Sequence, residues 1–249
     1  MNTNKFDSKG TVYSKARPNY PDALFSYLLA EGVIDKNTVA ADIGSGTGIF
    51  TIALSKFTNS VFAVEPNEDM RVKAEEKYKT IANITSINAT AENTSLPDCS
   101  VDLVTVAQAF HWFDRVAFKH ECKRILKSNG KVVLVWNDRD SEGEIIKDNF
   151  AVNKKYCKAF KGSSNGIDFS KDAFSDFFSG EFELVEFCNN LVYTREDFIA
   201  RNLSSSYAPK ENDPIYDDYI KAIADVFEKH QTNGTVNYPY ITRCYIGTI

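Results

Sequence analysis

The sequence has few cysteines and no long apolar run. Its five cysteines are an odd number and form no CxxC or CxxH pair, so we expect neither a disulfide framework nor a bound metal. The opening residues, MNTNKFDSKG, lack the apolar stretch of a signal peptide, and no segment approaches the roughly 18 apolar residues of a membrane helix. This pattern predicts a cytoplasmic protein with no membrane partner.

Positive charge is also scarce. The net charge is −5, whereas neutralising the phosphates of DNA or RNA requires a basic face, so a nucleic-acid partner is not expected. Aromatic residues are abundant instead, with 18 Phe, 12 Tyr and 2 Trp, which favours a lined pocket for a small-molecule substrate. The length of 249 residues predicts one α/β domain. Both a monomer and a homodimer remain open.

Strand-like and helix-like segments alternate in the first part of the chain, which predicts a parallel sheet covered by helices. The expected strands are 38–46, 60–66, 84–90, 101–109 and 131–137. The expected helices are 21–32, 48–57, 67–79 and 115–130.

The alternation is less regular after residue 140. Helical patterns occur at 144–160, 171–179, 195–203 and 213–230, and strand patterns at 181–189 and 241–249. Two interpretations remain open: a less regular half of the same sheet, or a helical cover over the ligand site. Two more strands are needed to complete a doubly wound sheet.

The stretch ADIGSGTG, residues 41–48, is the strongest chemical signal. It places Gly44, Gly46 and Gly48 where a strand meets a helix, and glycines let the backbone turn sharply and approach a ligand. The spacing is GxGxG and not the GxGxxG of dinucleotide sites. Asp42 disfavours a pyrophosphate and favours a ligand that presents positive charge or hydrogen-bond donors.

A second acid, Glu65, ends the next expected strand. A carboxylate there accepts hydrogen bonds from both hydroxyls of a ribose. The alternative is a structural turn with a surface acid. The loop after the third strand contains Ala91 and Glu92.

Taken in order, these segments resemble the class I S-adenosylmethionine-dependent methyltransferases. The resemblance rests on ADIGSGTG, VEPNEDM, ATAENTSLP, VDLVTVAQAFHWFD and RILKSNGKVVLV. YSKARPNYP, AQAFHWFD and TREDFIARNLSSSYAP are similar to a small-molecule subgroup that includes the trans-aconitate methyltransferase-like proteins.

The resemblance implies a Rossmann-like α/β fold in one domain, 1–249. Its sheet would have seven mostly parallel strands with an antiparallel last strand, and helices would cover the site. Residues 1–20 would form an N-terminal flap, 21–140 the cofactor-binding core, and 141–249 the rest of the sheet plus a substrate cover. The implied reaction transfers a methyl group from S-adenosylmethionine to a small molecule and releases S-adenosylhomocysteine.

The resemblance also implies cofactor contacts. The methionine part would be held by Asp42, Gly44, Ser45, Gly46, Thr47 and Gly48, the ribose by Glu65, the adenine by Pro66, Met70, Ala91 and Glu92, and the amine and sulfonium side by Ala107 and Gln108. For Pro66 and Met70 the alternative is packing at a helix start, since Met is a common gap-filler.

His111 follows the fourth strand, beside the expected position of the donor methyl. It is a candidate catalytic base for an acceptor that must lose a proton, and otherwise a wall of the substrate pocket. Trp112 and Phe113 either close over the acceptor or pack under the next helix.

Further substrate contacts are expected from Tyr13, Arg17 and Tyr20 in the flap, for which the alternative is a frayed tail, and from Tyr207. Arg17, Arg115 and Arg139 are candidates to pair with an acidic substrate, against simple solvation. NYPY, residues 237–240, is similar to a motif of nucleic-acid amino-methylating enzymes but stands in the wrong place. Two rival functions stay open: a nicotinamide-dependent oxidoreductase and a non-catalytic S-adenosylmethionine-binding protein.

Overall fold

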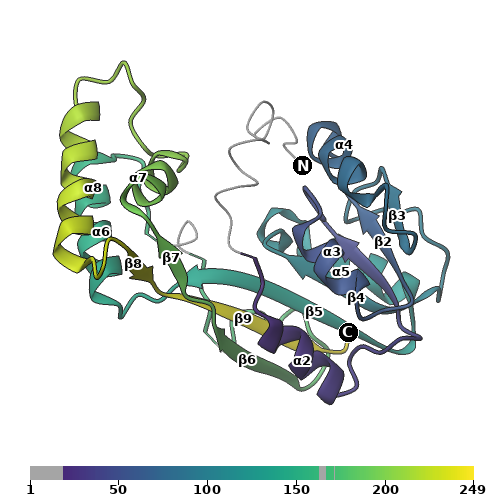
Figure 1. Cartoon of the computed structure of the whole chain (residues 1–249). Coiled ribbons are helices and arrows are strands. Elements are labelled where there is room, and N and C mark those ends of the chain that lie inside the picture. Colours follow the sequence, from purple (N-terminus) through teal and green to yellow (C-terminus); the bar gives the residue numbers. More distant parts are fainter. Residues whose placement is uncertain (1–18, 163–166, 171) are drawn as a thin grey trace.

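A computed structural model describes residues 19–162, 167–170 and 172–249 (Figure 1). Its centre is a seven-stranded sheet with the order β3-β2-β1-β4-β5-β9-β6. The strands are β1 (Val39–Ile43), β2 (Ser60–Val64), β3 (Ile84–Ile87), β4 (Val101–Ala107), β5 (Leu126–Arg139), β6 (Phe182–Cys188) and β9 (Tyr240–Gly247).

Strands β1 to β5 pair in parallel, and β9 runs antiparallel to both β5 and β6. The predicted seven-stranded sheet with an antiparallel last strand is confirmed. The strand order reverses direction between β1 and β4, and ligands of open α/β sheets bind outside the carboxyl ends of the strands at such a point. The glycine loop follows β1 and the AQAFHWFD stretch follows β4, so both lie at this point.

Helices cover both faces of the sheet, because every central strand is apolar on both sides. On one face, α2 (Asp22–Ala30) and α3 (Ile49–Ser55) bury Leu24, Phe25, Phe50 and Leu54 against it. On the other, α5 (Arg115–Ile125) packs beside a cluster that includes Trp136. The remaining helix of the first half is α4 (Glu68–Tyr78), which Asn67 caps by accepting from the Met70 N–H.

Two expected helices differ from the structure. The helix predicted over 115–130 ends at Ile125, because Leu126 already pairs with Val101 and the chain continues as β5. Residues 172–179 form turns and not the predicted helix. The phenylalanines of this segment pack into the core instead, and the Phe174 ring stacks on Trp136 with centroids 4.8 Å apart.

The second half of the chain completes the sheet and adds a separate group of helices; whether these helices cover a ligand site stays a prediction. Strands β6 and β9 complete the sheet. Helices α6 (Glu144–Tyr156), α7 (Arg195–Leu203) and α8 (Tyr216–His230) and the hairpin of β7 (Leu191–Tyr193) and β8 (Val236–Tyr238) share a separate apolar cluster, which we call the cover. The cover lies beyond the ends of β5 and β9 (Figure 1).

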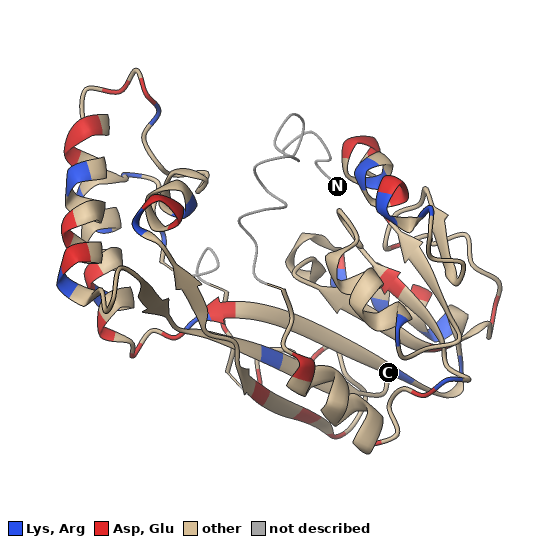
Figure 2. Ribbon diagram, viewed as in Figure 1, with Lys and Arg blue, Asp and Glu red and all other residues tan. Residues whose placement is uncertain are grey.

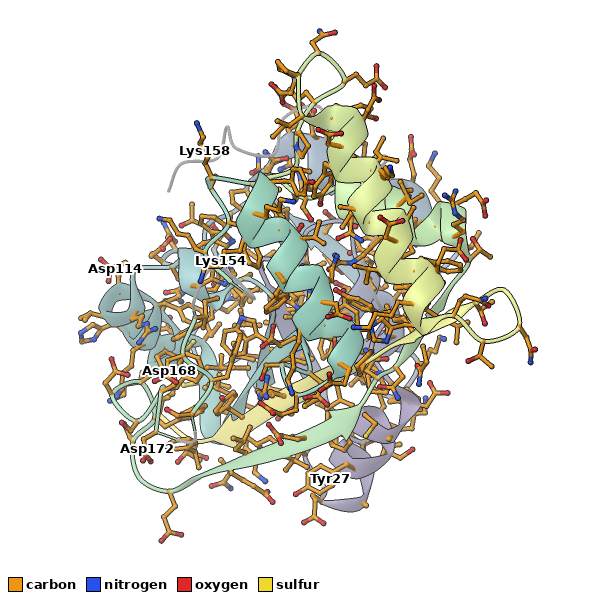
Figure 3. All side chains as sticks on the ribbon, turned by 90° about the vertical axis from the view of Figure 1, so that its left-hand side faces the viewer. Tyr27, Asp114, Lys154, Lys158, Asp168 and Asp172 are labelled. Atoms are coloured by element: carbon orange, nitrogen blue, oxygen red, sulfur yellow. The ribbon has the colours of Figure 1, made fainter. Side chains whose placement is uncertain are left out.

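The outer surface of the cover is mixed in charge. Basic and acidic residues both occur along α8, as they do along α4 (Figure 2). Seen from the side of the cover, α6 and α8 lie side by side, and Lys158 points away from them (Figure 3). Within the described ranges, none of the helices is both long and apolar enough to cross a bilayer.

Candidate cofactor site

The glycine loop connects β1 to α3 through three left-handed residues. Gly44, Gly46 and Gly48 have φ angles of 69°, 56° and 81°, which a residue with a Cβ adopts only with strain. The N–H groups of Gly44 and Ser45 donate to the Val64 carbonyl at 2.9 and 3.1 Å, so the loop is held against the end of β2.

Two neighbours press closely on the loop. A Cβ on Gly44 would lie 2.6 Å from the Cβ of Ala109, in the segment that follows β4. A side chain of α4 supplies a second support, since Lys77 Nζ donates to the Thr47 carbonyl at 2.8 Å. Only glycine therefore allows the loops after β1 and β4 to approach each other this closely.

Glu65 joins the loop to the end of β2. It is 7% exposed, and its Oε2 accepts from the Gly46 N–H at 2.9 Å while its Oε1 accepts from the Asn67 N–H at 2.8 Å. Burial raises the pKa of this carboxyl, and the two N–H groups oppose the rise. Each carboxylate oxygen has two lone pairs, so both retain one acceptor position beyond these bonds.

Asp42 lies beneath the loop and is 1% exposed. Its two oxygens accept from the hydroxyls of Thr51, at 2.6 Å, and Thr105, at 3.0 Å. Burial raises its pKa to about 6, the two hydroxyls act in the opposite direction, and the negative charge of Glu65 adds to the rise. Such perturbed carboxyl groups at the carboxyl ends of strands are typical of functional sites.

The residues expected around the adenine surround Glu65 in two loops. Met70 is almost fully buried at the start of α4, with its sulfur 3.8 Å from a Cβ built on Gly46, and Pro66 is half-buried. Ala91 is buried, and the half-buried Glu92 accepts from the Asp114 N–H at 3.1 Å. The structure therefore brings both expected loops to this end of the sheet.

Ala107 ends β4, and Gln108 follows with a φ of 60°. A left-handed conformation in a residue other than glycine is uncommon and is found at functional sites. The Gln108 N–H donates to the Val135 carbonyl at 2.9 Å and its Nε2 to the Asn137 carbonyl at 3.0 Å, which attach the turn to β5.

The next residues divide between core and surface. Phe110 is fully buried, and the Phe113 ring packs on Phe118 of α5 with centroids 4.9 Å apart, so Phe113 takes the expected role of packing under the following helix. His111 is half-buried, and its ring lies 4.8 Å from that of Trp112, which is 40% exposed. Both remain candidates to face an acceptor.

The other expected substrate contacts are scattered. Tyr13 and Arg17 lie outside the described residues. Tyr20 packs edge-on against Phe50 with centroids 4.8 Å apart. Arg115 lies over Phe110 and is 3.6 Å from the Asp176 carboxylate, an existing ion pair at the start of α5.

Arg139 and Tyr207 lie at the cover instead. Arg139 is the last residue of β5, next to the cover, and the Tyr207 ring packs on Phe160. Four further residues contact the buried charged groups and were not identified from the sequence. Thr51 and Thr105 bind Asp42 from a helix and a neighbouring strand, and Arg201 and Tyr240 approach each other in the cover.

Comparison with known proteins agrees with this geometry. Residues 41–134 match a family model described as a methyltransferase domain. A putative methyltransferase of Dictyostelium discoideum is 38% identical over 52% of this chain, and this match spans about half of that relative, 48% of its length. An uncharacterized methyltransferase of Schizosaccharomyces pombe is 26% identical over 94% of this chain and 92% of its own length.

The fold has solved counterparts. A putative type II methyltransferase from Anaeromyxobacter dehalogenans superposes with a TM-score of 0.65, at 20% identity, over 93% of this chain and 97% of its own. The matched residues 41–134 contain the glycine loop, Glu65 and the turn after β4, which are the parts that meet at the strand ends. Residues 41–134 are therefore similar to the methyltransferase domain family, and the whole chain shares its fold with a putative methyltransferase.

Proposed function

We propose that this protein transfers a methyl group from S-adenosylmethionine to a small-molecule acceptor. The observation that carries the proposal is the joint placement of Glu65 and the glycine loop, linked by the 2.9 Å bond from the Gly46 N–H. The Glu65 carboxylate has free acceptor positions that suit the hydroxyls of a ribose. The glycine loop beside it lets a ligand approach the backbone closely, which suits the methionine part of the cofactor.

The residues present fit this cofactor. The spare lone pairs of Glu65 are acceptors for two ribose hydroxyls, and the buried Asp42 places negative charge under the loop where a cationic ligand is stabilised. Pro66, Met70 and Ala91 offer apolar surface to a flat ring. A nicotinamide dinucleotide suits the site less well, because Asp42 would repel a pyrophosphate at this loop.

When bound, S-adenosylmethionine supplies an electrophilic methyl group on a good leaving group. The protein then contributes mainly proximity and alignment. The turn at Gln108 and the exposed edge formed by His111 and Trp112 would orient the acceptor. His111 would accept a proton only from an acceptor that has one to lose, such as a phenol.

The net charge of −5 and the aromatic content favour a small molecule as acceptor over a nucleic acid. The trans-aconitate methyltransferase-like proteins remain the subgroup that the sequence resembles, and we keep that assignment as part of the proposal.

Calorimetry with S-adenosylhomocysteine and with NAD tests the cofactor. We expect binding of the first and none of the second, and the reverse result would refute the proposal. Activity is tested by screening carboxylic acids, phenols and amines for release of S-adenosylhomocysteine from S-adenosylmethionine. Cofactor binding without turnover of any acceptor class would favour a non-catalytic binding protein.

A further inference from the structure

Arg201 is a buried cation in the cover, and no acidic residue within the described ranges forms an ion pair with it. It lies in α7 and is 7% exposed. Its Nε and Nη2 donate to the Tyr240 hydroxyl at 3.3 and 3.0 Å, and its guanidinium lies 5.1 Å from the centre of the Tyr238 ring. Its Nη1 is buried and has no hydrogen-bond partner in the described part of the chain. A buried charge is costly unless it is paired, so this position suits an anion.

A second guanidinium approaches the same tyrosine. Arg139 ends β5 and is the register partner of Tyr240 in β9. Its guanidinium lies 5.6 Å from the centre of the Phe150 ring, and its Nη1 is also buried, with no hydrogen-bond partner among the described residues. Among residues 19–162, 167–170 and 172–249, no carboxylate forms an ion pair with Arg139 or Arg201.

The Tyr207 hydroxyl is a third donor of this kind, since it is buried and no residue that the structure describes forms a hydrogen bond with it. Its ring packs on Phe160 with centroids 5.1 Å apart, and Phe160 packs on Phe150, the ring beside Arg139, at 5.3 Å. Tyr207 is also among the groups that interact electrostatically with Arg201. Three unused donors thus gather in one aromatic environment.

The positive charge of the two guanidinium groups affects the pKa of the tyrosine between them, Tyr240. Burial by itself raises the pKa of the Tyr240 hydroxyl, but Arg201 and then Arg139 outweigh burial and lower it. Further groups that interact electrostatically with Arg201 are tyrosines and not carboxylates, namely Tyr193, Tyr207, Tyr219 and Tyr238. The described cluster therefore carries two positive charges and no carboxylate to balance them.

One member of the cluster, Arg139, is connected to the turn after β4 through strand β5. Arg139 is two residues beyond Asn137, whose carbonyl accepts from the Gln108 side chain. At about 3.3 Å per residue along a strand, the backbone positions of Asn137 and Arg139 are about 7 Å apart.

We propose that Arg139, Arg201 and Tyr207 form a carboxylate-binding site that anchors an acidic group of the methyl acceptor. Guanidinium groups match carboxylates in geometry and charge, and a tyrosine hydroxyl adds a neutral donor. A carboxylate paired with two guanidiniums is a poor nucleophile, so the methylated atom is a different one in the same acceptor. The identity of the ligand as acceptor rests on the proposed function, whereas the existence of the site does not.

The test measures anion binding directly, by calorimetry and by thermal denaturation of the full chain, with and without S-adenosylhomocysteine. The probes are acetate, succinate and citrate, with neutral succinamide as the uncharged isostere and inorganic phosphate as the alternative oxyanion. We expect succinate or citrate to bind and to raise Tm, and succinamide to do neither. Absence of carboxylate binding up to tens of millimolar, equal binding of succinamide, or binding of phosphate alone would each overturn the proposal.

Variants assign the binding to this cluster. Arg201→Met should weaken carboxylate binding about 10- to 100-fold, and Tyr207→Phe about 3- to 10-fold, since charged hydrogen bonds contribute more than neutral ones. Arg195→Met is the matched control on the same helix, because Arg195 is exposed and pairs with Glu228. It should leave the affinity unchanged.

Stability separates a binding role from a structural one. Removing an unpaired buried charge should leave Tm of the free protein unchanged or higher in Arg201→Met. A large fall in Tm, or unchanged carboxylate affinity, would show that Arg201 is structural. The affinity for S-adenosylhomocysteine, measured in the same variants, should not change, so failure of the carboxylate site and failure of the proposed cofactor remain distinguishable.

Discussion

Replacing Glu65 by Gln is the most direct test of the cofactor site. In the native protein both carboxylate oxygens accept backbone N–H groups, from Gly46 at 2.9 Å and from Asn67 at 2.8 Å. Glutamine keeps the size of the side chain but has only one acceptor oxygen, so its NH2 group must face one of these two donors. Loss of one charged hydrogen bond amounts to about 1.5–3 kcal/mol, and the ribose loses an acceptor as well.

We therefore expect Glu65→Gln to weaken S-adenosylhomocysteine binding by about 10- to 100-fold in calorimetry. Glu68→Gln is the matched control, since Glu68 is an exposed acid in the first turn of α4, three residues away. Thermal denaturation of both variants reports how far the loop itself is loosened. An affinity of Glu65→Gln within about twofold of the wild type, or an equal loss in Glu68→Gln, would refute the assignment of Glu65.

Three further perturbations probe neighbouring parts of the site. In urea titrations, Gly44→Ala should lower the free energy of unfolding by at least ~1 kcal/mol more than Gly32→Ala. Both glycines have a positive φ, but, of the two, only a Cβ at Gly44 would have a neighbour within 4 Å among the described residues, Ala109 being the nearest. Equal losses would contradict the close approach of the two loops. Burial raises the pKa of Asp42 from 3.8 to about 6, which means that the folded state holds this proton more tightly than the unfolded state. The free energy of unfolding should therefore fall by roughly 3 kcal/mol as pH rises from about 4 to 6. The affinity for a cationic cofactor should change in the other direction and fall as pH decreases through 6. Asp42→Asn should remove both trends, and their persistence would show that another group titrates. His111→Ala should raise KM with kcat and the pH-rate profile unchanged if the imidazole lines the pocket, whereas loss of the increase in rate with pH would identify a base.

Much of the first half could be predicted from local patterns. The alternation of apolar strands and amphipathic helices over 38–137 indicated the parallel sheet, and the glycines marked a turn that only glycine tolerates. Family resemblance then supplied the strand count and the antiparallel β9. The end of α5 could not be read this way, because the sequence after Ile125 has basic residues and a glycine typical of a helix end, and pairing of Leu126 with Val101 decided otherwise.

Long-range contacts account for the other differences. The segment 172–179 has a helical pattern, but its phenylalanines bury against Trp136 and the backbone turns to allow this. The strands β7 and β8 are three residues each and are separated by 42 residues, from Tyr193 to Val236, so neither is visible without its partner.

The sequence by itself determined the alternation of strands and helices in the first half, the glycine loop and the position of Glu65 at a strand end, because these depend on residues close together in the chain. Only the tertiary structure decided which groups bind the two buried acids: the hydroxyls of Thr51 and Thr105 donate to Asp42, and the N–H groups of Gly46 and Asn67 donate to Glu65. It also decided that Arg139 and Arg201 both lie beside Tyr240. The partners of a buried charge are chosen by packing between distant segments, and the cost of leaving that charge unpaired becomes visible only when all of its neighbours are known.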